Sequence, residues 1–402
     1  MHLLLALVVF GGLLWQLWLH GREIRFQRRR ATASRTTDYP LQRLRFARVG
    51  LVIEALFVLL MLALGLEGLE RLWLAAGLSG GWLDGALLLS VLLLQAAVQR
   101  AVTLLRIWRV ERPFGYSCQS AGGFFRDTLI KGGLLLLCGA ALAAVATHLL
   151  AAGWRAGWWG LALLWVVFVW ARGMLWPALV APLFNRYRPY PDAGLDYRMQ
   201  AMALQAGVRV GPLLELNGSR RSSHGNAQVT GFGAARRVVL LDTLRGILEP
   251  EELLAVVAHE IGHLGARHLA VYQCCNLLAA TLWIGLFSVL AGASFLASGS
   301  GLALLWLLSP TAALLVKPLF ARLIRGFEHQ ADAFAETCGY GDALACALLK
   351  LTRHNGAAAE SDPWFARVYH SHPRLAERLR RLRVAAERRA AKPFGHGLLG
   401  EY

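Results

Sequence analysis

The chain alternates long apolar stretches with shorter polar segments that are rich in arginine. A helix crosses a bilayer with about 20 apolar residues, and seven stretches are near that length. They lie at about 3–19, 49–66, 83–105, 130–152, 157–182, 270–295 and 302–320. The last two share a run without charged residues, from Leu269 to Val316, which is too long for one span. Its Ser298-Gly299-Ser300-Gly301 segment is typical of a turn, so we predict a hairpin of two spans.

Residues 185–268 are polar enough to lie in water, and their pattern predicts a small α+β unit. Residues 194–206 have helical spacing, 226–232 and 237–241 have the pattern of two strands, and 233–235 suits a turn. Pro250 followed by two glutamates is typical of a helix start. We therefore predict a mostly α, polytopic membrane protein with a small α+β unit. Its four parts are 1–184 with about five spans, 185–268, a two-span hairpin at 269–320, and a C-terminal segment at 321–402.

Composition agrees with this class, because 56% of the residues are hydrophobic, 17% are charged and the mean hydropathy is +0.45. Arginines follow the first span, and basic and nearly uncharged loops then alternate. This alternation predicts an uncleaved anchor, an N-terminus outside and a C-terminus in the cytoplasm. The membrane would be the inner or plasma membrane of a bacterium, or an ER-type membrane of a eukaryote. The net charge of +17 lies mainly in membrane-flanking loops, so we expect anionic lipids, and no nucleic acid, as partners.

The run His259-Glu260-Ile261-Gly262-His263 has the spacing of a metal site on a helix. Residues four apart share a helix face, so both histidines can bind one ion. Glu260 can then act as the general base toward the attacking water. A short motif of this kind also occurs by coincidence, so it needs support from elsewhere in the chain.

A second run, Phe327 to Asp332, supplies that support. A hairpin returns the chain to the membrane face it left, which places Glu328 beside the two histidines as a third ligand. Asp332 lies one helical turn further on the same face. His329 points to another face, and His268 is a weak candidate for an additional ligand. We therefore predict one Zn²⁺ per chain, held by His259, His263 and Glu328 on the cytoplasmic side.

Two further clusters could complete a peptidase site. His372 and Arg378 in the tail are suitable donors to an oxyanion, although a histidine in a surface loop would look the same in sequence. An exposed strand edge can hold a peptide substrate by adding it to the sheet. Asn226, with Ala227, is the candidate for that edge, while an ordinary structural hairpin would have the same pattern.

Several runs together resemble the integral-membrane CAAX prenyl protease family of zinc metalloendopeptidases. Besides the metal motifs, they are Ala181–Asn185, Gly218–Ala227, Val239–Leu244, Ser371–Pro373 with Glu377-Arg378, and Arg109–Tyr116. The resemblance covers roughly residues 100–385. It implies seven membrane helices around a water-filled chamber that the zinc site faces. It also implies that Asp332 orients a ligand histidine, and that His372 and Arg378 bind the oxyanion and substrate carbonyl.

The function that we expect is peptide hydrolysis by a zinc-activated water, on C-terminal peptides of prenylated or other membrane-associated proteins. One alternative is a quality-control protease for membrane proteins that has no prenyl requirement. Another is a transporter or scaffold without catalysis. The intact His259, Glu260, His263 and Glu328 set disfavours the scaffold, and the lack of an inverted repeat disfavours the transporter.

Overall fold

The computed structural model describes residues 2–30, 35–151, 154–231 and 236–390. Within them, seven helical segments are long and apolar enough to cross a membrane, in agreement with the sequence. They are Leu3–Arg30, Asp38–Ala75, Gly80–Glu111, Ala121–Leu150, Trp158–Leu175, His268–Ala291 and Gly299–Thr337. Several extend well beyond the apolar stretches, so their ends reach into the polar half of the molecule.

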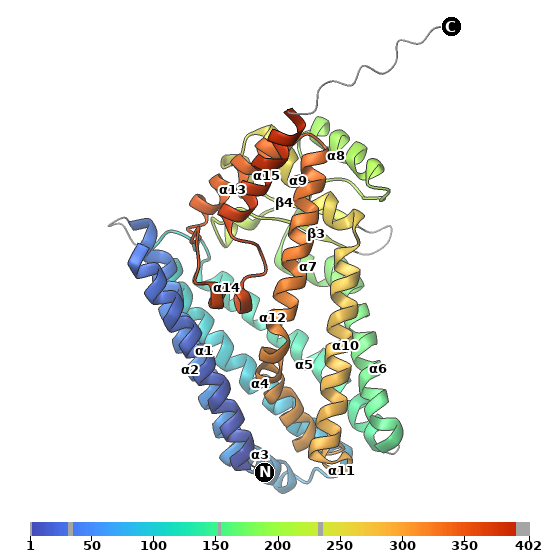
Figure 1. Cartoon of the computed structure of the whole chain (residues 1–402). Helices are drawn as coiled ribbons and strands as arrows, with labels where there is room; N and C mark the ends of the chain where they lie inside the picture. The colour runs from blue at the N-terminus through green and yellow to red at the C-terminus, as the bar shows by residue number, and fades with distance from the viewer. Residues whose placement is uncertain (1, 31–34, 152–153, 232–235, 391–402) are drawn as a thin grey trace.

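The membrane helices form one elongated half of the molecule, and the sheet with its helices lies at one end (Figure 1). The spans comprise α1 (His2–Arg30), α2 (Arg35–Leu60) with α3 (Leu66–Ala75), α4 (Gly80–Arg106), α5 (Ala121–Ala151), α6 (Trp154–Leu175), α10 (His268–Ala291) and α12 (Gly299–Thr337). Single π-helical turns interrupt or extend three of them, at Met61–Gly65, Ile107–Glu111 and Trp176–Val180. Large side chains on the outer faces are exposed, as expected for a surface that contacts lipid.

Polar contacts also occur inside the membrane half. Gln95 of α4 is buried, donates a hydrogen bond to Glu54 of α2, and accepts one from Trp306 Nε1 of α12 at 2.6 Å. Polar groups at this depth need partners, and here three helices supply them to one another. The network therefore ties α2, α4 and α12 together.

The aqueous end contains a four-stranded sheet in the order β1-β2-β4-β3. The strands are β1 (Tyr187–Pro189), β2 (Leu214–Leu216), β3 (Ala227–Thr230) and β4 (Arg237–Leu241). β2 and β4 are parallel, and the other pairs are antiparallel. β4 is an inner strand whose Val238, Val239 and Leu240 are fully buried in the core, and β3 is an edge strand.

Helices cover this sheet and build the core of the aqueous end. They are α8 (Ala193–Gln205), α9 (Pro250–Gly265), α13 (Gly341–His354), α14 (Pro363–Tyr369) and α15 (Leu375–Ala390). α9 is buried along most of its length, and it packs against α8, α13 and the C-terminal half of α12. α12 therefore belongs to both halves of the molecule, as Figure 1 shows.

The structure corrects the sequence prediction in two respects. The hairpin turn lies at Gly292 and the short helix α11 (Ala293–Leu296), not at 298–301, because Ser298 caps α12 by accepting a hydrogen bond from the Gly301 amide. Gly292 has φ of 86°, which favours glycine. β1 and β2 were not predicted. The predicted turn at 233–235, with the end of its first strand at 232, lies outside the described residues.

Candidate metal centre

α9 carries the first two candidate ligands and starts where the sequence predicts. Pro250 is at the first helical position, and Glu249 and Glu252 form a capping box in which the Glu249 amide donates to Glu252 at 2.8 Å. Lys350 of α13 donates to the same carboxylate at 2.8 Å. The start of α9 is therefore fixed two turns before the histidines.

Gly262, between the two histidines, lets α9 approach α12 closely. A Cβ atom at this position would lie 3.0 Å from the Ala331 Cα and 3.0 Å from the Phe334 Cβ. Ala331 and Ala335 of α12 are small and fully buried at the same contact. Small residues on both helices bring the backbone of α12 near enough for Glu328 to reach the histidines.

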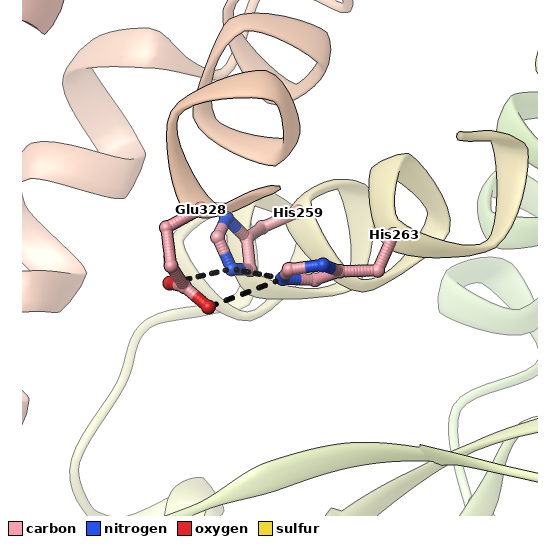
Figure 2. Close-up of side chains that lie close together, drawn as sticks. All are labelled: His259, His263 and Glu328. Carbon is pink, nitrogen blue, oxygen red and sulfur yellow. Dashed lines mark hydrogen bonds and ion pairs between the residues drawn. The ribbon is translucent and has the colours of Figure 1, made fainter. Parts of the chain in front are cut away.

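Three side chains from these helices meet in one place, as Figure 2 shows. His259 Nε2 lies 3.1 Å from His263 Nε2 and 3.6 Å from Glu328 Oε2, and His263 Nε2 lies 3.5 Å from Glu328 Oε1. A tetrahedral zinc with bonds of about 2.0–2.1 Å places its ligand atoms about 3.3 Å apart. The spacing therefore fits three ligands of one such ion.

The surroundings of Glu328 also fit a cation. Its Oε2 atom is buried, and no described residue offers it an aligned hydrogen-bond donor. His372 Nδ1 lies 2.8 Å from this oxygen, and His259 Nε2 and Arg378 Nη1 lie 3.6 Å from it. A buried carboxylate needs strong compensation, which a metal ion together with these groups would supply.

Asp332 and Arg378 support the site from behind. Asp332 Oδ1 lies 2.9 Å from His259 Nδ1, the ring nitrogen that faces away from the other ligands. Arg378 of α15 donates from Nε at 2.8 Å and from Nη2 at 2.5 Å to the two oxygens of Asp332. Arg378 is only 7% exposed, and although burial works against its charge, the Asp332 contacts raise its pKa. Its main contact is thus with Asp332.

Glu260 and His372 lie at the accessible side of the cluster. Glu260 is partly exposed and follows His259 directly in α9. Burial alone would lower the pKa of His263, but its contact with Glu328 and the charge of Glu260 outweigh burial and raise it. His372, in the loop between α14 and α15, has a side chain that is 66% exposed while it contacts Glu328. Glu260 and His372 are therefore exposed enough for a substrate to contact them, whereas Arg378 is buried.

His268 lies beside this cluster but contacts only one of its members. Its Nδ1 is 2.8 Å from His263 Nδ1, and its Nε2 is 2.8 Å from Gln330 Oε1. His329 pairs with Glu377 instead, at 3.1 Å. Gln330 was not anticipated from the sequence, because nothing in its local pattern indicates a contact with a residue of another helix.

The candidate substrate strand is an edge of the sheet. β3 pairs with β4 from Ala227↔Leu240 to Thr230↔Arg237, and it is the last strand in the sheet order. The Asn226 carbonyl accepts the Leu241 amide at 3.0 Å, and the residue is exposed. β3 also packs against α9, so this edge runs beside the helix that carries the histidines.

Comparison with known proteins agrees with this arrangement. Residues 189–386 match the model of peptidase family M48, and residues 22–186 match the N-terminal region of CAAX prenyl proteases with five membrane helices. A CAAX prenyl protease 1 homolog of Oryza sativa is 32% identical over 69% of this chain and 67% of its own length. The chain belongs to the CAAX prenyl proteases of peptidase family M48.

Other relatives extend the comparison. CAAX prenyl protease 1 of Saccharomyces cerevisiae is 30% identical over 58% of this chain and 56% of its own length. The crystal structure of S. mikatae Ste24p has the same fold, with a TM-score of 0.84, 21% identity, and coverage of 95% of this chain and 98% of that chain. The alignments span about two thirds of the length of the first relatives.

Family membership confirms the expected class of protein. It is an integral-membrane metalloendopeptidase with a Ste24p-like fold of seven membrane helices around a chamber, and a small sheet at one end. A metal and a peptide or protein substrate follow from the family. The break between the two family models, after residue 186, lies close to the predicted start of the aqueous segment.

Proposed function

We propose that this CAAX prenyl protease holds one Zn²⁺ per chain on His259, His263 and Glu328 and cleaves prenylated C-terminal peptides. The observation that carries the proposal is the meeting of two Nε2 atoms and one buried carboxylate at ligand spacing. Two imidazoles and a glutamate form a donor set that suits zinc in hydrolytic sites. A zinc ion held by these three residues would polarise the scissile carbonyl and make water a stronger nucleophile.

Glu260 is the general base in this proposal. It follows a ligand directly in α9 and is partly exposed, so it can reach a water in the site. It accepts the proton of the attacking water and passes it to the leaving amine. Proton transfer by a positioned group contributes about 10²–10⁴ in rate.

His372 and Arg378 have different parts. His372 is exposed beside Glu328 and can donate to the oxygen that becomes negatively charged on the substrate. Arg378 donates two hydrogen bonds to Asp332, which supports a role in positioning Asp332 and, through it, His259. We therefore favour His372 over Arg378 as the direct oxyanion donor.

β3 is the proposed binding strand for the substrate. No described strand pairs with its outer edge, so this edge can pair with an extended peptide through backbone hydrogen bonds. Asn226 directly precedes β3, and Ala227 is its first residue. Backbone pairing recognises an extended conformation rather than a particular sequence. Selection among peptides would then depend on the chamber and on any lipid that the substrate carries.

We also propose that the metal end of the molecule faces the cytoplasm. The ends of several arginine-rich segments gather there: Arg22 donates to Asp362 near α14, and Arg221 of the aqueous unit donates to Asp127 of α5. Clustering of basic residues on one side is typical of the cytoplasmic face. Exposed arginines on this face, such as Arg28, Arg29 and Arg30, suit anionic lipid headgroups.

The substrate class can be tested with matched peptides. Purified protein is assayed on a farnesylated C-terminal peptide and on the same peptide without the lipid, before and after zinc removal by a chelator. We expect preferential cleavage of the farnesylated peptide, loss of cleavage with the chelator, and recovery with one equivalent of zinc. Equal zinc-dependent cleavage of both would instead favour a protease without a prenyl requirement, and chelator-resistant cleavage would contradict the metal mechanism.

A further inference from the structure

We propose that His268 and Gln330 are positioning residues that hold His263 in its metal-binding orientation. This inference rests on the proposed function, because it takes His263 as a zinc ligand. His263 directs Nε2 toward His259 and Glu328, and its other nitrogen, Nδ1, lies 2.8 Å from His268 Nδ1. The second nitrogen of His268 lies 2.8 Å from Gln330 Oε1.

In the series of hydrogen bonds from His263 through His268 to Gln330, every bond can have one donor and one acceptor. With the Nε2 lone pair of His263 on the metal, its proton is on Nδ1 and is donated to His268 Nδ1. His268 then carries its own proton on Nε2 and donates it to the amide oxygen of Gln330. Each of these nitrogen and oxygen atoms takes part in one hydrogen bond, either as donor or as acceptor. This series of hydrogen bonds therefore fixes the tautomer of both rings. Ligand histidines commonly need such a partner for their other nitrogen.

The two zinc-binding histidines thus have different partners. His259 Nδ1 faces the Asp332 carboxylate at 2.9 Å, whereas His263 Nδ1 faces a neutral imidazole whose far side ends on an amide. No described acid takes the place of His268 on the His263 side. His268 and Gln330 therefore do for His263 what Asp332 does for His259.

A break in the helix makes this contact possible. On a continuous helix, a residue five positions after His263 would lie about 140° around the axis, away from it. α9 ends at Gly265, Arg267 adopts a left-handed conformation with φ of 56°, and α10 begins at His268. This conformation is uncommon for a residue with a side chain. The turn redirects the chain so that His268 comes back toward His263.

Packing fixes His268 further. The residue is 4% exposed, and its ring stacks on Phe327 with centroids 4.2 Å apart and planes at 14°. Phe327 precedes the ligand Glu328 in α12, so the stack ties α10 to the third ligand's helix. Gln330 is exposed and lines an open groove of about 340 Å³, formed by Leu319, Arg322, Leu323, Gly326, Phe327 and Gln330. Its substitution should therefore not disturb the core.

Zinc affinity of the full-length protein, measured by competition with a chromogenic chelator, tests the proposal without relying on activity. His268→Phe keeps an aromatic ring to stack on Phe327 but removes both nitrogens. Gln330→Leu removes the acceptor, and Gln330→Glu retains one. We expect about a 10-fold weaker Kd for His268→Phe, a smaller loss for Gln330→Leu, and wild-type or tighter affinity for Gln330→Glu. The d–d spectrum of the cobalt-substituted protein should change in the first two variants only.

In this proposal Gln330 acts on His263 only through His268, so a double variant tests the proposal more sharply than the single variants do. The His268→Phe, Gln330→Leu double variant should bind zinc no more weakly than His268→Phe alone. His148→Phe, at an exposed histidine of α5, is the matched control and should retain wild-type affinity. Thermal unfolding of each zinc-free variant shows whether the fold is intact.

His263→Ala separates this proposal from the proposed function. Suppose that His263→Ala abolishes zinc binding while His268→Phe binds zinc within twofold of wild type. The positioning role of His268 and Gln330, called the relay below, is then wrong, and the ligand set holds. If His263→Ala binds zinc like wild type, the ligand set itself is wrong. Independent, multiplicative losses in the double variant, or equal losses for Gln330→Glu and Gln330→Leu, would also overturn the relay.

Discussion

At the scale of single residues, the site depends on groups that touch the ligands as much as on the ligands. The sequence predicts His259, His263 and Glu328 because their types and spacings follow directly from helix geometry and a hairpin. It cannot reveal that Arg378 pairs with Asp332 or that Gln330 reaches His268, because those contacts join separate helices through tertiary packing. The pattern of residue types along the sequence does not show which way a side chain points where two helices pack together.

Asp332→Asn should weaken zinc binding by about 10–100-fold, because a neutral amide holds and polarises His259 less well than a carboxylate. Equilibrium zinc titration of the variant and the wild type measures the change. Glu336→Gln, one turn further along α12 and not a member of the ligand group, is the matched control. Unchanged affinity in Asp332→Asn would show that the 2.9 Å contact with His259 does not support the ligand.

At the scale of elements, the site requires α9 and α12 to lie unusually close together. The pattern of the sequence predicts both helices and their apolar faces, and α8, β3 and β4 lie near their predicted positions. It does not show β1 and β2, because each has only three residues and too little alternation to indicate a strand. The hairpin turn was misplaced because glycine and serine suit a helix start as well as a turn.

Gly262→Val should push α9 and α12 apart, since a side chain there would meet the Ala331 backbone and Phe334. We expect a loss of about 1–3 kcal/mol in stability from overpacking, together with weaker zinc binding. Gly326→Ala is a control on α12, because its Cβ meets nothing within 4 Å. That control should keep or slightly raise stability. Native-like melting and zinc affinity in Gly262→Val would contradict the close contact.

Contacts between α1 and the segment before α14 predict a pH dependence. Burial would raise the pKa of Asp362, but the hydrogen bonds from Arg22 and from the Phe365 and Trp364 amides lower it overall. A carboxyl whose pKa is lower in the folded state stabilises the fold above about pH 4, its unfolded value, and loses that contribution as pH falls through the folded value.

Asp362→Asn should therefore lower the free energy of unfolding by about 1–3 kcal/mol at pH 7 and by much less below pH 3. Melting temperatures of the variant and the wild type across this range test the expectation. A difference that stays constant with pH would show that the Asp362 charge does not stabilise the fold.

At the scale of the whole molecule, hydropathy alone predicts the membrane-spanning segments well. Seven apolar segments give the spans, and the alternation of basic loops gives an orientation. In three dimensions the basic segments and the metal centre lie at the same end, away from the start of α1 (Figure 1). How the spans surround a chamber is not contained in hydropathy, because it depends on which helix faces pack together.

The orientation predicts opposite labelling of two positions. In sealed, right-side-out vesicles and a background without other cysteines, Cys346, exposed on α13, should react with a membrane-impermeant maleimide only after permeabilisation. A cysteine introduced by Ser79→Cys, in the loop before α4, should react from outside. The reverse pattern would place the metal centre outside the cytoplasm.

The most direct test of the account is cleavage of the farnesylated peptide by Glu260→Gln, with zinc content measured on the same sample. We predict one zinc per chain, as in the wild type, and a rate lower by about 10²–10⁴, because the ligands remain while the group that takes the proton is gone. Wild-type cleavage by a zinc-loaded Glu260→Gln variant would contradict the mechanism proposed for this site.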